Sequence, residues 1–142
     1  MNSRSQMYTG TMKSDLVTLF EALADRTRLR LLHLMTAGEI CVCYFVEVLG
    51  EAQPKISRHL AYLRRAGVVA ARRDGKWMHY RIVRPADAQQ ARVLDCALDA
   101  AAADRQMIRD EAALQRACCA TRLPALLQRA PKPEFARVRT SG

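Results

Sequence analysis

The amino-acid sequence predicts a mainly α-helical domain that carries one β-hairpin. Two observations lead to this prediction. Before residue 68 and after residue 85, apolar residues recur at intervals of three and four, which is the period of an amphipathic helix. Between these regions the interval changes to two, and the pair Asp74-Gly75 separates the two alternating runs. An Asp-Gly pair in that position is typical of a hairpin turn.

The first predicted helix begins at Ser14, whose hydroxyl can cap the free backbone N–H groups of a helix start. Its apolar residues follow at the 0, 3, 4, 7 spacing of one helix face: Leu16, Leu19, Phe20 and Leu23. Asp25 offers the cap of a second helix. The inward residues of the second helix are expected to be Leu29, Leu32 and Met35, with Gly38 past its end.

A short third helix is predicted over residues 43–49 and is closed by Gly50. Pro54 suits the first position of a fourth helix, where the backbone N–H that proline lacks is not needed. The inward side of the fourth helix is formed by Ile56, Leu60 and Leu63, and Gly67 follows as a C-terminal stop. His59 borders this apolar side, so we interpret it as a structural hydrogen-bonding residue.

The hairpin is expected to have a type I′ turn at Asp74-Gly75 and two distinct faces. Alternation places one set of side chains together on the packing face: Val69, Ala71, Met78, Tyr80 and Ile82. The opposite face is basic and partly aromatic: Ala70, Arg72, Trp77, His79 and Arg81. The hairpin can therefore pack with one face and present positive charge with the other.

From Pro85 to about Ala117 the pattern is helical again and rich in alanine. Its apolar residues lie near one face: Leu94, Leu98, Ala101, Ile108 and Ala112. Little of the domain is left to cover so long a helix, so its apolar side is expected to pack on a second copy of the chain or on the first helix of a partner. This predicts a dimer formed through the first and last helices.

The chain is therefore divided into a flexible N-terminal arm (1–13), one domain (14–119) and a basic, disordered tail (120–142). The sequence contains no run of eighteen apolar residues, which is about the length that a membrane-spanning helix needs. The first dozen residues lack the apolar core of a signal peptide. We therefore expect a cytoplasmic protein, in a reducing compartment where its five cysteines stay thiols for packing, soft-metal binding or redox sensing.

Positive charge is concentrated in one segment of the chain. The formal net charge is +9. Residues 53–84 contain a single acidic side chain, Asp74, and nine basic ones: Lys55, Arg58, Arg64, Arg65, Arg72, Arg73, Lys76, Arg81 and Arg84. Such an excess of positive charge favours nucleic acid or an anionic surface as the partner.

The order of two helices joined by a tight connection, the second of them basic, followed by a basic hairpin is that of a winged helix-turn-helix. A helix fits the DNA major groove and reads base edges with the residues near its N-terminus. The base-contact candidates are Gln53, Lys55, Ser57 and Arg58. The candidates for contacts to the DNA backbone are Arg72, Arg73 and Lys76 in the hairpin.

Three segments together resemble the ArsR family of metal-responsive repressors, in particular its arsenic-responsive type. They are EICVC (39–43), QPKISRHLAYLRRAGVV (53–69) and DGKWMHYRIV (74–83). The resemblance implies a winged-helix homodimer that represses transcription by binding operator DNA. It also implies release from the operator when As(III) or Sb(III) binds cysteine thiolates, with Cys41 and Cys43 as ligands.

The expected position of a helix start near both cysteines predicts lowered thiol pKa values, because the helix dipole favours the thiolate. The fullest family pattern has a third cysteine three residues after the second, and here Val46 stands there. Two thiolates can suffice with a small thiol or solvent in the third place; otherwise Cys96, Cys118 or Cys119 supplies the third. The adjacent pair Cys118-Cys119 is either a second arsenical site or incidental, and Cys96 is interpreted as packing.

Zinc-type sensors of this family use Asp and His ligands on the last helix. All three histidines here precede Pro85, so no zinc site is predicted there. A thiol redox-sensing repressor of the same fold remains an alternative. A thiol-based detoxification enzyme is disfavoured, because the chain has no C-x-x-C motif, no phosphate-binding loop and no convincing pair of nucleophile and base.

Overall fold

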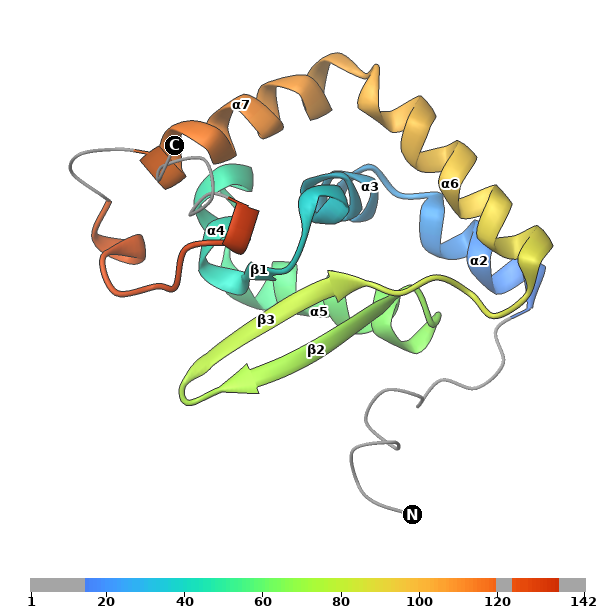
Figure 1. Cartoon of the computed structure of the whole chain (residues 1–142), viewed down its shortest axis with the longest axis horizontal. Coiled ribbons are helices and arrows are strands. Elements are labelled where there is room, and N and C mark those ends of the chain that lie inside the picture. The colour runs from blue at the N-terminus through green and yellow to red at the C-terminus, as the bar shows by residue number, and fades with distance from the viewer. Residues whose placement is uncertain (1–14, 120–123, 136–142) are drawn as a thin grey trace.

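The computed structural model describes residues 15–119 and 124–135 (Figure 1). This part of the chain is mainly helical, with a small antiparallel sheet of strand order β1-β3-β2, which confirms the predicted fold class. The elements in chain order, with η for a 3₁₀ helix, are α2 (Leu16–Leu23), α3 (Arg26–Leu34), η1 (Met35–Ala37), β1 (Ile40–Cys41), α4 (Val42–Leu49), α5 (Gln53–Arg65), β2 (Val69–Asp74), β3 (Trp77–Ile82), α6 (Ala88–Ala102), α7 (Arg105–Cys119) and η2 (Ala125–Leu127). No helix in the described ranges is long and apolar enough to cross a membrane.

The helix starts differ slightly from the prediction. The side chain of Asp15, not Ser14, caps α2 by accepting a 2.8 Å hydrogen bond from the backbone N–H of Thr18; Ser14 and the predicted arm 1–13 lie outside the described residues. Asp25 caps α3 as predicted. Helix α5 begins at Gln53, so Pro54 occupies its second position, where the backbone N–H likewise has no partner within the helix.

The inward residues of α3 to α5 form the core of the molecule. Leu32, Ile56, Leu60 and Leu63 have no exposed surface. In α2, Leu19 and Leu23 are buried, but two of its four predicted inward residues are not: Leu16 is 46% exposed and Phe20 51%. Part of the apolar side of α2 is therefore left exposed to solvent in the single chain.

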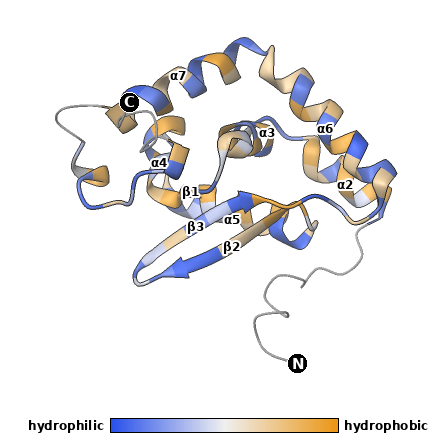
Figure 2. Ribbon diagram, in the orientation of Figure 1, coloured by the Kyte–Doolittle hydropathy of each residue, from blue (hydrophilic) through white to orange (hydrophobic). Residues whose placement is uncertain are grey.

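The register gives the hairpin the two predicted sets of side chains, but Ala70 and His79 of the predicted outer face are buried, at 3% and 6% exposed, and the turn differs from the prediction. Val69 pairs with Ile82 and Asp74 with Trp77, so the two turn residues are Gly75 and Lys76. Gly75 has φ +63°, and no non-glycine residue in the described ranges has a positive φ. A positive φ at only the first turn residue fits type II′, so the predicted type I′ turn at Asp74-Gly75 is wrong. Figure 2 shows hydrophilic residues along the outer part of the hairpin.

The predicted single helix over residues 85–117 is two helices, which meet in an arch (Figure 1). Asp87 caps α6. Asp104 interrupts the predicted helix because it caps the start of α7: its side chain accepts hydrogen bonds from the backbone N–H groups of Gln106 (2.8 Å) and Met107 (3.3 Å). Arg26 of α3 holds the same carboxylate at 3.1 Å and lowers its pKa to about 2.

The break shifts which side of α7 faces inward. The predicted inward residue Ile108 is 54% exposed and Ala112 is exposed, whereas Met107 and Leu114 are buried. Helix α7 packs on α3 and α4 of its own chain. The domain therefore covers α7 itself, contrary to the expectation that a second copy would do so.

Two polar pairs fix α7 on α3 in addition to the one at Asp104. Arg30 donates two hydrogen bonds to Asp110, at 2.7 and 2.9 Å, and the Asp110 side chain is only 3% exposed. His33 Nε2 lies 3.2 Å from a carboxylate oxygen of Glu111. These contacts occupy the acidic side chains that α7 directs toward α3.

Residues 124–135 differ from the disordered tail predicted for 120–142. Helix η2 contacts α4, and Leu127 has no exposed surface while Ala130 is 8% exposed. The Phe135 ring lies against Gly38, 3.5 Å from where a Cβ atom would stand. In Figure 1 this segment returns from the end of α7 to the region of α4 and β1. The described part of the tail thus belongs to the packed core.

Candidate functional site

The α4–α5 pair presents a helix-turn-helix with a polar outer side. Gly50 ends α4 in the left-handed conformation, at φ 68°, and only Glu51 and Ala52 separate it from α5. The inner side of α5 is fully buried, which fixes its outer side toward solvent. Positive charge continues to the end of α5, where Arg64 and Arg65 are exposed.

The four predicted base-contact residues all lie in the first half of α5. Gln53 and Arg58 are exposed, and Lys55 and Ser57 are partly buried. Lys55 Nζ forms an ion pair, at 3.2 Å, with Glu51, which lies in the loop that leads into the helix. The structure therefore places these residues together at the N-terminal end of α5, the end that a major-groove helix directs at bases.

The three hairpin candidates are not equivalent. Arg73 and Lys76 are exposed near the turn, and Lys76 Nζ lies 5.1 Å from the centre of the Trp77 ring. Arg72 makes a two-pronged pair with Glu39, at 2.6 and 3.0 Å, and its guanidinium lowers the pKa of that carboxyl. The charge of Arg72 is thus partly neutralised within strand β2, whereas Arg73 and Lys76 lie nearer the hairpin tip.

His59 has the structural position that its place beside the apolar stripe predicted. Its Nδ1 atom lies 3.9 Å from a carboxylate oxygen of Asp25 and 3.5 Å from the guanidinium of Arg28. That guanidinium also lies over the Tyr62 ring, 4.0 Å from its centre. These contacts join α3 to the inner flank of α5.

Cys41 and Cys43 lie close together at the junction of β1 and α4. Cys41 ends β1 and caps α4 in an extended conformation (φ −72°, ψ 142°), so it lies before the helix. Two residues at positions i and i+2 inside a helix would point about 200° apart. Because Cys41 is outside the helix, that constraint does not separate the two sulfur atoms. The Cys41 side chain is buried and that of Cys43 is partly buried.

The predicted lowering of thiol pKa is wrong for Cys41. Burial raises the pKa of Cys41 to about 11, and this outweighs the hydrogen bond from the Cys43 backbone, which lowers it. An ordinary cysteine thiol titrates near 8.5. Cys41 is therefore a protonated thiol at neutral pH, and a ligand that binds it has to displace that proton.

The other three cysteines lie in different surroundings. Cys118 is 1% exposed and lies where the end of α7 packs on α4, while its neighbour Cys119 is exposed. Cys96 is exposed on α6. Tyr44, which follows Cys43, is fully buried, and its hydroxyl has no hydrogen-bond partner among the described residues. Tyr44 was not among the residues that the sequence pattern indicated, although it directly follows the Cys-Val-Cys motif.

No group of three or more His, Cys, Asp or Glu side chains within residues 15–119 and 124–135 is arranged to hold a metal ion. On α7, the carboxylates of Asp110 and Glu111 already contact Arg30 and His33 of α3. Cys41 and Cys43 are therefore the soft donors that the structure brings together directly.

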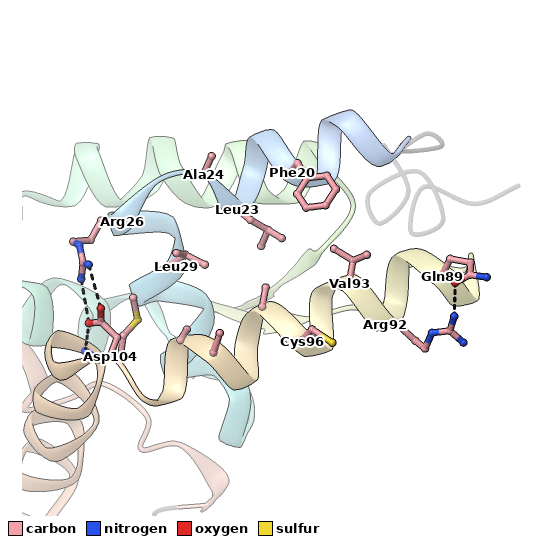
Figure 3. A pocket seen from close by; sticks show the side chains of 14 residues that line it. Phe20, Leu23, Ala24, Arg26, Leu29, Gln89, Arg92, Val93, Cys96 and Asp104 are labelled. Atoms are coloured by element: carbon pink, nitrogen blue, oxygen red, sulfur yellow. Dashed lines mark hydrogen bonds and ion pairs between the residues drawn. The ribbon is translucent and has the colours of Figure 1, made fainter.

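An apolar groove of about 790 Å³ runs between α2 and α6. Figure 3 shows Phe20 and Leu23 along one side and Val93 and Cys96 along the other. The adjoining surface of α2 exposes Leu16 and Val17, the latter at 64%. Exposed apolar surface of this kind is typical of a protein–protein interface.

Comparison with known proteins places the helix-turn-helix in one family. Residues 25–71 match the model described as "Bacterial regulatory protein, arsR family". The arsenical resistance operon repressor of Escherichia coli is 46% identical over 80 residues, which are 56% of this chain and 68% of that protein. An arsenic resistance transcriptional regulator of Pseudomonas putida is 51% identical over 65 residues, 45% of this chain and 51% of that protein.

Among solved structures, the transcriptional repressor BigR from Xylella fastidiosa superimposes with a TM-score of 0.51 at 25% identity. The match covers 70% of this chain and 96% of that chain. The arrangement of helices and hairpin is thus shared with a known repressor.

Proposed function

Since the chain belongs to the ArsR family of bacterial regulatory proteins, we propose that it is a repressor of arsenical resistance genes that binds operator DNA as a homodimer. As(III) or Sb(III) releases it by binding Cys41 and Cys43. The family and these relatives are transcription regulators, so the chain is not an enzyme. Trivalent arsenic and antimony are soft ions that prefer sulfur ligands, which fits the Cys41 and Cys43 pair.

The position of Cys41 between the two DNA-binding elements carries this proposal. Through β1, Cys41 pairs with His79 of the hairpin strand β3. Through α4, the same residue leads into the loop 50–52 that sets the start of α5. A ligand that draws the Cys41 and Cys43 sulfurs together therefore acts on both the hairpin and the recognition helix. A shift of the hairpin or of α5 changes how well the two elements together fit the DNA.

We assign α5 to the major groove and the hairpin to the flanking DNA backbone. Gln53, Lys55, Ser57 and Arg58 contact bases. Arg73 and Lys76 contact phosphates, and Arg72 joins them at the cost of its contact with Glu39. The second copy of the chain occupies the α2–α6 groove, because α2 and α6 have apolar surface there that their own chain leaves uncovered.

This assignment predicts two different effects on DNA binding. Arg73→Ala and Lys76→Ala should weaken binding to all sequences alike and flatten the salt dependence, by about 0.9 in the logarithmic slope for each phosphate that is no longer neutralised. Arg58→Ala should instead relax the sequence preference. Fluorescence anisotropy between 50 and 200 mM salt, on operator and scrambled DNA, measures both. Arg109→Ala, an equal charge change on α7, is the control and should change neither; hairpin variants with altered base preference and an unchanged slope would contradict the assignment.

The proposed function is tested by titrating the protein–operator complex with arsenite, antimonite and hydrogen peroxide. Arsenite and antimonite should release the wild-type protein with about a 5- to 150-fold loss of operator affinity. The Cys41→Ser/Cys43→Ser protein should keep its operator affinity and lose the response, whereas Cys96→Ser should respond normally. Release by peroxide alone, without an arsenite effect, would favour the redox-sensing alternative and overturn the proposal.

A further inference from the structure

We propose that Cys118 supplies the third sulfur ligand of the As(III) site, so that binding draws the end of α7 onto the start of α4. This inference rests on the proposed function, which names only two ligands. Arsenite has three exchangeable oxygen positions, and Val46 stands where the family pattern has a third cysteine. The third ligand must therefore come from elsewhere in the chain or from solvent.

The packing of the core brings Cys118 to the Cys41 and Cys43 pair. Helix α7 contacts α4, and its C-terminal end lies beside α4 in Figure 1. Cys118 and Cys41 are both 1% exposed and belong to the same buried core cluster. Burial raises the pKa of Tyr44, and Cys118, Cys41 and Cys43 all raise it further, which indicates that the three cysteines surround the same hydroxyl. Cys118 is thus near the pair although 75 or more residues separate them in sequence.

The Tyr44 hydroxyl is an independent indication of a binding site at this point. It is fully buried, and no described residue forms a hydrogen bond with it. An unpaired buried hydroxyl is costly, so it usually has a water, an ion or a ligand as its partner. A ligand oxygen or a thiolate formed beside Tyr44 would accept its hydrogen bond. The residues around Tyr44 therefore provide three sulfur donors and one unpaired proton donor.

The other cysteines are less suitable. Cys96 lines the α2–α6 groove, and the described residues that line this groove include no second thiol. Cys119 is exposed, and on a regular helix it points about 100° away from Cys118.

Binding exchanges three As–O bonds for three As–S bonds. Each thiol gives its proton to the hydroxide that leaves arsenic, so arsenous acid and three thiols yield the tris-thiolate and three waters, with no change of oxidation state. In the described structure the three thiols are not yet arranged as a metal site. Closure therefore has to move the end of α7 or the start of α4, and α7 is tied to α3 by the Arg30–Asp110 pair.

The test compares Cys118→Ser with Cys119→Ser, a matched change one residue away. X-ray absorption at the arsenic edge should count three sulfur neighbours in the wild type and in Cys119→Ser, and two in Cys118→Ser. Arsenite affinity should fall about 100-fold or more in Cys118→Ser, because the variant cannot form the third tethered As–S bond. Phenylarsine oxide, whose As–C bond leaves only two positions for thiolates, should bind Cys118→Ser as it binds the wild type.

Cys118→Ala is a second variant for this buried position, and both variants should keep wild-type operator affinity without arsenite. Three sulfur neighbours in Cys118→Ser, an equal loss of affinity for both arsenicals, or an equal loss in Cys119→Ser would overturn the assignment. The Cys41→Ser/Cys43→Ser protein separates this result from the proposed function. If that protein binds arsenite normally, the site itself is misplaced, and not only its third ligand.

Discussion

Asp110→Ala is expected to lower the free energy of unfolding by about 3–5 kcal/mol. The change leaves the largely buried guanidinium of Arg30 without its carboxylate, and an unpaired buried charge is far costlier than an absent pair. It also removes the acceptor of a hydrogen bond from Gln106. Urea denaturation followed by circular dichroism measures the change.

Two controls distinguish the cost of leaving a buried charge unpaired from the cost of losing an ion pair as such. Arg26→Ala removes an ion pair between α3 and the start of α7, but Arg26 is 63% exposed, so its loss should cost less than about 1 kcal/mol. Replacing the buried pair as a whole, in Arg30→Met/Asp110→Leu, should cost much less than Asp110→Ala alone. Equal destabilisation by Asp110→Ala and Arg26→Ala would show that the buried pair does not hold α7 on α3.

Phe20→Glu is expected to convert the dimer into monomers and to weaken binding to a palindromic operator about 1000-fold or more. The glutamate would place a charge in the apolar groove that we assign to the second copy. A monomer that contacts one half-site retains little beyond non-specific affinity. Sedimentation at micromolar concentration and anisotropy on operator DNA measure the two effects.

Ile108→Glu is the matched control for Phe20→Glu. Ile108 is an exposed apolar residue of similar accessibility, but it lies on α7 outside the groove. Its substitution should leave assembly and DNA binding unchanged. A charge at Leu94 would not serve, because that side chain is fully buried within one chain and its loss would unfold the domain. A wild-type protein that sediments as a monomer would contradict the assigned interface.

Local periodicity was sufficient to predict most of the fold. The stripe Ile56, Leu60 and Leu63 lies inward as predicted, because the period of apolar residues fixes which side of a helix is buried. The two sets of side chains on the hairpin also follow from alternation, but the burial of Ala70 and His79 on the predicted outer face does not. The turn was placed one residue early, because Asp-Gly is compatible with more than one hairpin register and only the cross-strand pairs decide between them.

The errors concern features that depend on distant parts of the chain. The start of α7 is capped by Asp104, whose side-chain partner Arg26 is 78 residues away. The packing of residues 124–135 depends on apolar surface that α4 presents only after folding. Strand β1 contains two residues and is defined by its pairing with β3. A periodicity argument cannot detect any of these.

The candidate site was predicted unevenly for a similar reason. Cys41 and Cys43 are close in sequence, so the motif alone was enough to predict that they lie close together in the structure. Whether Cys118 or Cys119 faces the core depends on which side of α7 is turned inward. That side differs from the one predicted for a continuous helix, because α7 starts anew after Asp104. Likewise, the contact of Arg72 with Glu39 depends on the pairing of β1 with β3 and could not be predicted from the basic pattern of the hairpin.

The central claim, that arsenite at Cys41 and Cys43 and operator DNA at α5 and the hairpin oppose one another, is tested most directly by arsenite affinity with and without operator. Binding free energies at two coupled sites are reciprocal. Saturating operator should therefore weaken arsenite binding by the same factor by which arsenite weakens operator binding, about 5- to 150-fold. Equal arsenite affinities in the free and operator-bound protein would contradict the account.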